Sequence, residues 1–296
     1  MSNHARQVSE WRSTFLVPES SRLDLGARDT RDARARMIGK TEAHALLAAA
    51  VDRLAVLQDR LYADRRWSFL VILQAMDAGG KDGTIKHVFS GVNPQGVCVV
   101  SFKAPGPEDL AHDFLWRVHR VLPARGIIGV FNRSHYEEVV VARVHPGLLA
   151  PQRLPEVVSD RPHFWENRLG DIRAFESYLA RQGTRIVKIF LHVGDAEQKA
   201  RLRARLEDPD KLWKFDPGDL AERARRTDYM AAYETAITAT STREAPWHVV
   251  PADQKWFARL VVADILVSSL EALDLRTPEP DQATLDRLAE ARRDLA

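Results

Sequence analysis

The hydrophobic positions of this chain alternate between helical repeats and short unbroken apolar runs. Thr41–Tyr62 carries leucines and a valine at helical spacing, which predicts a helix. The next apolar segment, Trp67–Leu73, is a continuous run typical of a strand buried on both faces. Four further strands are predicted at Val97–Phe102, Gly126–Phe131, Arg185–Val193 and Trp247–Val250.

Helical patterns separate these strands. One helix is predicted to begin near Gly83, and the others are predicted at Pro107–Leu122, Asn167–Gln182, Asp195–Leu206, Leu220–Thr240 and Gln254–Leu273. Strands that alternate with helices favour an α/β fold with a mainly parallel five-stranded sheet, sandwiched by helices. We expect residues 41–273 to form one domain. Residues 1–40 are expected to be an irregular arm, and residues 274–296 a linker and charged tail with a helix at Leu285–Leu295.

Composition narrows the function classes only slightly. The 296 residues are 45% hydrophobic, which is ordinary for a globular protein, and the formal charge is only +2. The overall charge therefore gives no sign of a nucleic-acid partner, and only local clusters could indicate a polyanion. The single cysteine, Cys98, excludes an internal disulfide and is expected to be a buried structural thiol. We expect a cytoplasmic protein without a membrane partner, because neither an apolar leader nor a membrane-length stretch is present.

The segment Gln74–Thr84 (QAMDAGGKDGT) follows a buried strand and precedes a helix, which is the context of a phosphate-binding loop. Small residues let backbone N–H groups approach an anion, the helix start adds its dipole, and Lys81 supplies a positive charge. The pattern is imperfect, because Asp82 follows the lysine and a hydroxyl appears only at Thr84. A plain glycine turn with a solvated lysine is the alternative. The small residues are Ala78, Gly79, Gly80 and Gly83.

Two carboxylates stand beside this expected anion site. Asp77 and Asp82 would repel a phosphate unless a cation lay between them and the phosphate oxygens. Oxygen ligands of this kind suit Mg²⁺, with Mn²⁺ as the alternative ion. The pattern therefore predicts a metal-dependent site with Asp77 as a candidate ligand.

The third predicted strand runs into residues 132–138, NRSHYEE. Ligands gather at the carboxyl ends of parallel strands, so Asn132, Arg133 and Glu137 are candidates for the same site. Arg133 could clamp a phosphate, and Glu137 could hold a metal-bound water or the acceptor. The alternative is an ordinary helix start with a solvated acidic face. His135 and His145 flank the segment, and one of them could act as a phosphohistidine nucleophile. This step is not needed, because the loop and magnesium suffice for direct in-line transfer of a phosphoryl group.

A basic segment, Lys199–Arg226, follows the fourth strand. Within it, the stretch Glu207–Gly218 is long for a connection and carries prolines, aromatics and lysines, as lids often do. Such a lid could close over phosphates and exclude water. The alternative is a solvated charged helix and surface loop.

These segments together resemble family-2 polyphosphate kinases. The resemblance spans about residues 10–273 and rests on four blocks in the family's order: residues 74–105, FNRSHYEEVVVARVHP at 131–146, RLEDPDKLWKFDPGDL at 205–220, and residues 245–266. It implies a P-loop kinase fold similar to thymidylate kinase, with a lid at about residues 207–218. It also implies a homo-oligomer, either a dimer or a tetramer.

The resemblance implies roles for individual residues. Asp77 and Lys81 match the family's loop acid and lysine, Arg133 its second-block arginine, and Lys103 the basic residue after its second strand. The lid bases fall on Arg205, Lys211 and Lys214. Other members often have Asp where this chain has Asn132, which weakens metal binding there and favours Asp77.

The function implied is Mg²⁺-dependent, reversible phosphoryl transfer between inorganic polyphosphate and nucleotides. The loop and Tyr136-Glu137-Glu138 look most similar to the subgroup that acts on both AMP and ADP, and guanine nucleotides are further expected substrates. An ATP-dependent kinase of a small metabolite is one rival. A non-catalytic polyanion-binding module is the other, although the loop carboxylates argue against it.

Overall fold

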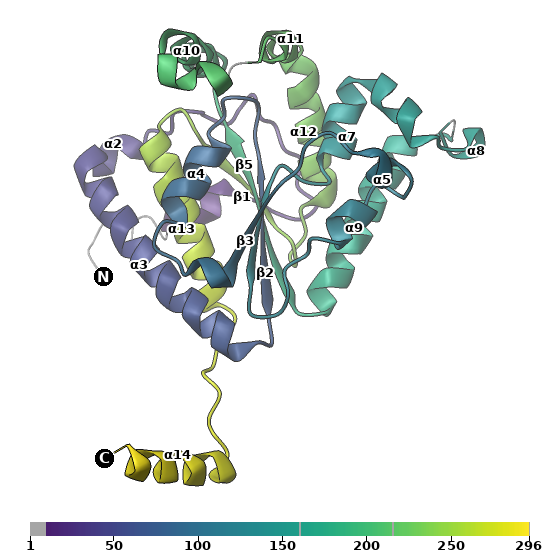
Figure 1. Cartoon of the computed structure of the whole chain (residues 1–296). Helices are drawn as coiled ribbons and strands as arrows, with labels where there is room; N and C mark the ends of the chain where they lie inside the picture. The colour runs from purple at the N-terminus through teal and green to yellow at the C-terminus, as the bar shows by residue number, and fades with distance from the viewer. Residues whose placement is uncertain (1–9, 160, 215, 296) are drawn as a thin grey trace.

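A six-stranded sheet runs through the centre of the structure (Figure 1), a computed structural model that describes residues 10–159, 161–214 and 216–295. The spatial order is β1-β6-β5-β2-β4-β3. Strands β2 to β6 lie parallel to one another, which confirms the predicted parallel sheet. The strands are β1 (Leu16–Val17), β2 (Ser68–Gln74), β3 (Val97–Ser101), β4 (Ile128–Asn132), β5 (Thr184–His192) and β6 (Trp247–Pro251).

The N-terminal arm contributes to this sheet and is not merely an irregular covering. Strand β1 pairs antiparallel with β6 and adds a sixth strand that the apolar pattern did not predict. A strand of two residues is too short to show a period of two. Residues 10–15 and α2 (Ala35–Ile38) are helical, and five arm side chains are buried in the main core. These are Phe15, Val17, Leu23, Leu25 and Ala35.

Two layers of helices cover the sheet. Figure 1 shows α3 (Lys40–Asp64), α4 (Lys81–Val88) and α13 (Lys255–Glu271) on one face. The other face carries α7 (Glu137–Val144), α9 (Phe164–Arg181) and α12 (Arg226–Thr240). All seven residues of β2 are buried between these layers, as a strand covered on both sides requires. The central strand therefore holds the loop that follows it in a fixed position.

Two predicted helices are each interrupted. The segment predicted as one helix from Pro107 to Leu122 forms α5 (Pro107–Leu110) and α6 (Trp116–His119), because the Asp113 side chain accepts the Leu115 N–H at 2.9 Å and starts a new turn. The predicted helix Leu220–Thr240 divides into α11 (Gly218–Ala224) and α12 at Arg225. Short elements fill other connections: η1 (Pro94–Gly96), η2 (Pro146–Gln152) and α8 (Glu156–Ser159).

The expectation for Cys98 is wrong, because the residue is exposed. Strand β3 lies at the edge of the sheet, so an apolar run there is only partly covered. Its neighbour Val99 is 48% exposed. An unbroken apolar run thus indicates a strand, but it does not show that the strand is central.

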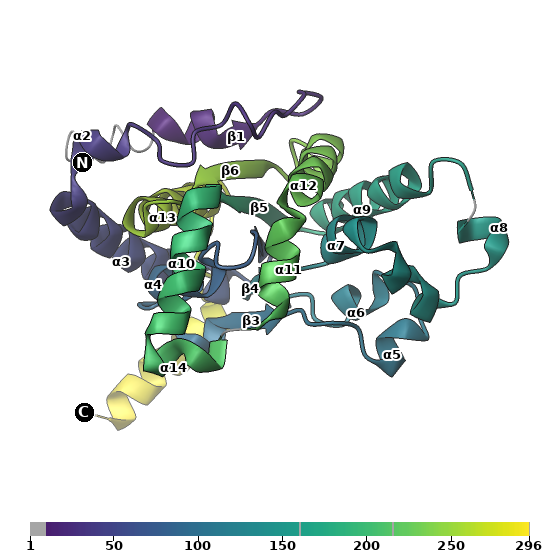
Figure 2. The ribbon, with the colours of Figure 1, turned by 90° about the horizontal axis from the view of Figure 1, so that it is seen from above.

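The carboxyl ends of the parallel strands lie beneath a helical cap. Seen from above in Figure 2, α10 (Asp195–Glu207) and α11 lie over this end, and η3 (Pro209–Lys214) follows α10. At the opposite end, α14 (Gln282–Asp294) stands away from the body after an extended segment (Figure 1). Within the described ranges, none of the helices has both the length and the apolar character for a membrane crossing.

Candidate active site at the strand ends

A cavity of about 830 Å³ opens at the carboxyl ends of β2, β3 and β4. Its walls bring together segments that the sequence placed more than a hundred residues apart. Twelve predicted site residues line it: Asp77, Ala78, Gly79, Gly80, Lys81, Asp82, Gly83, Thr84, Lys103, Asn132, Arg133 and Arg205. We call this cavity the phosphate cleft.

The loop between β2 and α4 has the shape of an anion cradle. Gly80 has φ 108° and Ala78 has φ 57°, both in the left-handed region. A Cβ on Gly79 would lie 2.6 Å from the Cβ of Ala75, so only glycine fits there. Helix α4 begins directly after Gly80, and the N–H groups of its first turn have no partner within the helix. The start of α4 therefore offers backbone donors beside the cleft.

Lys81 is not a solvated surface lysine. Its ammonium donates to the Ala75 carbonyl at 2.8 Å and contacts the Met76 carbonyl at 3.5 Å. The residue is 9% exposed, and this burial lowers the pKa of Lys81 although the Asp77 carboxylate acts to raise it. The lysine thus braces the loop from inside and still lines the cleft.

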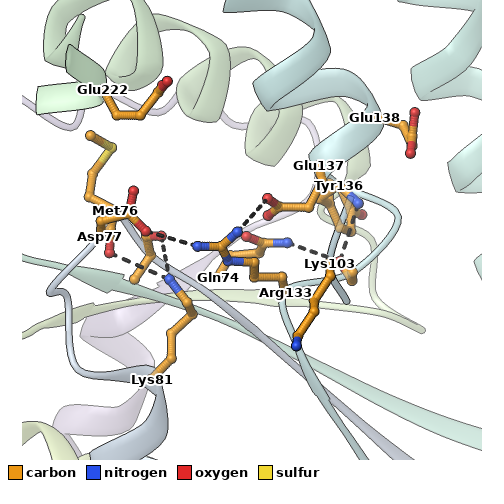
Figure 3. Close-up of polar contacts among 12 residues, drawn as sticks. Gln74, Met76, Asp77, Lys81, Lys103, Arg133, Tyr136, Glu137, Glu138 and Glu222 are labelled. Carbon is orange, nitrogen blue, oxygen red and sulfur yellow. Dashed lines mark hydrogen bonds and ion pairs between the residues drawn. The ribbon is translucent and has the colours of Figure 1, made fainter. Parts of the chain in front are cut away.

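Arg133 lies between two carboxylates (Figure 3). Its Nη2 donates to Asp77 Oδ1 at 2.9 Å, and its Nη1 lies 4.0 Å from Glu137 Oε2. The backbone of Arg133 adopts φ 65°, and its N–H donates to the Leu73 carbonyl at 3.0 Å. Burial raises the pKa of Glu137, while Arg133 and Lys81 act to lower it. Arg133 directly follows β4 and Asp77 lies in the loop after β2, so two neighbouring strands bring this pair together.

Asp82 and Asn132 form a second pair across the loop. The Asn132 Nδ2 donates to Asp82 Oδ1 at 2.8 Å, which joins the first turn of α4 to the end of β4. The amide at position 132 therefore has its own carboxylate partner. The acidic charge of this part of the cleft lies on the loop side, at Asp77 and Asp82.

The lid candidates are only partly placed. The Arg205 Nη1 pairs with Asp219 Oδ2 at 3.1 Å, and both residues line the cleft, as does Trp213. Burial raises the pKa of Asp219, while Arg205 acts to lower it. The side chains of Lys211 and Lys214 lie outside the described residues. The lid prediction for these two lysines therefore stays a prediction.

A second polar network lies in the core behind Tyr136, and we call it the core network. Lys188 on β5 forms an ion pair with Glu176 on α9 and donates to the Tyr136 hydroxyl at 3.0 Å and to the Thr240 carbonyl at 2.8 Å. His135 also contacts Glu176, at 3.2 Å. Although burial acts to raise it, Lys188 and His135 hold the pKa of Glu176 below its usual range.

The residues after Arg133 do not form a solvated acidic face. Glu138 is 6% exposed, accepts from Arg117 Nη2 at 3.0 Å and from Gln152 at 2.8 Å, and points away from the cleft (Figure 3). His135 is fully buried in the core network, and His145 lies 2.8 Å from Glu222 Oε2. Neither histidine is among the residues that line the cleft.

Sequence reasoning missed two residues on α10 that hold the loop. Gln198 donates to the Asp77 carbonyl at 3.0 Å, and Arg201 donates to the carbonyls of Ala78 and Gly79, each at 3.1 Å. A signal for them existed. Positions 198, 201 and 205 are separated by three and four residues, so they share one helical face.

The donor set of the cleft fits a hard divalent cation. Asp77 and Asp82 offer carboxylate oxygens, and Asn132 offers an amide oxygen. In the part of the chain that the structure describes, no three His, Cys, Asp or Glu residues gather as a protein-only metal cage. An ion here would take its remaining ligands from phosphate oxygens and water, which is how Mg²⁺ is usually bound.

Comparisons with known proteins agree with this geometry. The family model "Polyphosphate kinase 2 (PPK2)" matches residues 37–278. The chain is 47% identical over 281 residues to an ADP-polyphosphate phosphotransferase of Rhodopseudomonas palustris, covering 95% of this chain and 97% of that protein. It is 46% identical over 270 residues to an AMP/ADP-polyphosphate phosphotransferase of Meiothermus ruber, covering 91% and 97%.

The fold also matches a solved structure. The crystal structure of polyphosphate kinase 2 from Arthrobacter aurescens TC1 superposes with a TM-score of 0.83 at 43% identity, covering 94% of this chain and 95% of that one. Since the family model spans most of the chain and these relatives align almost end to end, this chain belongs to the polyphosphate kinase 2 family.

Proposed function

We propose that this enzyme transfers phosphoryl groups reversibly between inorganic polyphosphate and adenine nucleotides, accepting both AMP and ADP. The carrying observation is the phosphate cleft, in which a backbone cradle, Lys81 and Arg133 converge at the strand ends. Family membership and the activities named for the two bacterial relatives support the donor and the acceptors. Phosphoryl transfer needs little covalent help from the protein, so positioning and charge neutralisation provide most of the catalysis.

The residues of the cleft divide this work. The loop N–H groups and Lys81 bind the phosphates at the start of α4, where the helix dipole favours anions. Arg133 can exchange its contact with Asp77 for a bidentate contact with phosphate oxygens, because guanidinium geometry matches both acceptors. Glu137 limits where Arg133 can move. Lys103 and the lid bases Arg205, Lys211 and Lys214 are proposed to bind the extended anion and to exclude water.

We propose that Asp77 holds Mg²⁺, with Asp82 and Asn132 next to it, and that Mn²⁺ can substitute. The bound ion supplies charge neutralisation of the phosphate oxygens. An Asp77→Asn variant should keep its fold and lose affinity for the metal. Titration calorimetry with Mg²⁺ and tripolyphosphate tests this independently of turnover, and unchanged metal binding would remove Asp77 as a ligand.

The decisive experiment combines purified protein, polyphosphate and Mg²⁺ with AMP, ADP, GMP or GDP in turn, and products are separated by chromatography. We expect ADP to appear first from AMP and ATP to follow, and guanine nucleotides to react as well. Turnover with ATP and a metabolite, but none with polyphosphate, would support the metabolite-kinase alternative. Metal-independent binding without turnover would support the polyanion-binding module. A homo-oligomeric state and a cytoplasmic location remain predictions.

A further inference from the structure

Five successive carbonyl groups of the phosphate loop, those of residues 75–79, accept hydrogen bonds from within the protein. Lys81 donates to the carbonyls of residues 75 and 76, and the carbonyl of residue 76 also accepts the Gly79 N–H at 3.0 Å. The next three carbonyls, of Asp77, Ala78 and Gly79, accept from α10, through Gln198 at 3.0 Å and through Arg201 at 3.1 Å each. Five successive carbonyl oxygens thus face protein donors and not the cleft.

This arrangement determines where the loop N–H groups point. In a trans peptide unit the N–H is directed opposite to the C=O. Since the carbonyls of Asp77 and Gly79 point to α10, the N–H groups of Ala78 and Gly80 point away from that helix. Both residues line the cleft. If the carbonyls were released, a peptide could flip and present an oxygen to the anion, which would replace attraction with repulsion.

The guanidinium of Arg201 has no donor left for a phosphate. Its Nη2 donates to the carbonyls of Ala252 at 2.5 Å and Asp253 at 3.1 Å, and its Nε donates to Glu197 at 2.7 Å. With the two loop contacts, all five N–H donors of the fork are used. The residue is 8% exposed. A lysine cannot reproduce this geometry, because its three donors radiate from one point.

We propose that Arg201 and Gln198 are positioning residues that hold the phosphate loop in its anion-binding conformation. Arg201 borders the cleft, but because its five donors are already used it acts through the loop backbone and not through a hydrogen bond to substrate. Because α10 continues into η3, the same contacts connect the loop to the lid segment. This proposal rests on the proposed function only in taking polyphosphate as the anion.

The test compares the charge-conserving Arg201→Lys and the neutral Arg201→Gln with wild type. Arg203→Lys and Arg203→Gln are the matched controls, since Arg203 lies on the same helix, is 78% exposed and pairs only with Glu207 in the hydrogen-bond and ion-pair contacts described. The measurements are polyphosphate affinity by calorimetry at several salt concentrations, kcat and KM, and thermal unfolding. Wild-type protein that fails to bind polyphosphate would count against the proposed function instead.

We expect both Arg201 variants to lose at least about 10-fold in polyphosphate affinity, while the Arg203 variants stay within about twofold. The slope of log affinity against log salt should not change, because a residue that contacts no phosphate releases no counterion. A slope reduced by about one would show direct phosphate contact and overturn the proposal. Normal affinity in Arg201→Lys, or a lower melting temperature with normal affinity and kcat/KM, would also overturn it.

Gln198→Met provides a second test if the Arg201 variants do not fold. It removes one loop contact, keeps the side-chain volume similar and leaves Arg201 in place. It also removes the hydrogen bond that Gln198 accepts from Arg226 Nη1 at 3.0 Å, so Arg226→Met is measured beside it and should keep wild-type polyphosphate affinity. We expect about a threefold to tenfold loss of polyphosphate affinity with an unchanged salt slope. Wild-type affinity in this variant would contradict the proposal.

Discussion

The phosphate cleft and the core network both bury lysine near carboxylate, yet they are built for different purposes. In the core network, Lys188 is 0% exposed at its side chain and Glu176 is 2% exposed. All three donors of Lys188 are used, on Glu176, Tyr136 and Thr240. In the cleft, Arg133 is 42% exposed and Asp77 is 26% exposed, and one of the two carboxylate contacts of Arg133 is long, at 4.0 Å.

This difference shows that burial of charge alone does not mark a functional site. The ammonium of Lys188 is saturated, so it can stabilise one arrangement but cannot accept a ligand without losing a contact. In the cleft, Arg133 and Asp77 keep exposed faces, and the contact of Arg133 with Glu137 is loose. The remaining hydrogen-bonding capacity, and not the depth of burial, separates a group that binds substrate from a group that holds the fold.

The largest expected effect comes from removing one charge of the core network, which tests whether this network serves stability and not catalysis. Lys188→Met should lower the free energy of unfolding by about 3–5 kcal/mol, because Glu176 is left buried without its cation. Urea unfolding measures this loss. Turnover per folded molecule should stay within about threefold of wild type.

A matched double variant shows whether the pair or the single charge matters. Lys188→Met combined with Glu176→Gln should recover most of the lost stability, since replacing both partners removes the uncompensated charge. If the single variant lost less than about 1 kcal/mol, the core network would not carry the buried ion pair as described.

The same change in the cleft should affect rate far more than stability. Lys81→Met should lower kcat/KM by about 10²–10³-fold, the range found when one donor to developing charge is removed. Because Lys81 also donates to the Ala75 carbonyl, the free energy of unfolding should fall, but by less than in Lys188→Met. Lys86→Met, an exposed lysine one turn later on α4, is the control and should be active. Near-normal turnover of Lys81→Met would remove the lysine from the phosphate site.

A smaller effect is expected at Glu137, which should influence the preference between AMP and ADP. Glu137→Gln keeps the shape but removes one of the two charges that flank Arg133, so we expect the ratio of kcat/KM for AMP and ADP to change by about 10-fold, or 1.4 kcal/mol. Burial raises the pKa of Glu137. The acidic limb of the wild-type pH–kcat/KM profile should therefore lie above an ordinary glutamate pKa, and this limb should shift in the variant. An equal fall in kcat/KM for AMP and ADP, with no shift of the acidic limb, would contradict this role.

The smallest effect concerns pH and stability. Burial lowers the pKa of His192 and His248 to about 4, below the unfolded value near 6.5. The unfolded chain therefore binds protons first, and stability falls as pH drops below about 6.5. Each histidine should cost about 0.5–1 kcal/mol between pH 7 and 6. His248→Gln should reduce that slope, and an unchanged slope in urea unfolding would contradict the assignment.

The elements that could be predicted from the sequence are those with a local signal, namely a regular apolar pattern or a position directly after a strand. The five parallel strands and the loop with Lys81 were visible because apolar runs and glycines are local signals. Asp113 and Arg225, which interrupt predicted helices, act through contacts that no helical period reveals. The spacing of positions 198, 201 and 205 indicates a shared helical face, but it does not show what that face contacts. The partners of Arg201 are backbone carbonyls distant in sequence, and no residue type identifies them.

The short strand β1 has a consequence for how far this chain can be trimmed. The family match begins at residue 37, so a chain cut to that boundary would lack β1 and its buried neighbours Phe15, Leu23 and Leu25. The outer edge of β6 would then expose unpaired backbone donors and acceptors, which serve as a template for pairing with another molecule. By covering the edge of β6, the arm thus limits self-association through the sheet, which is a role separate from phosphate binding.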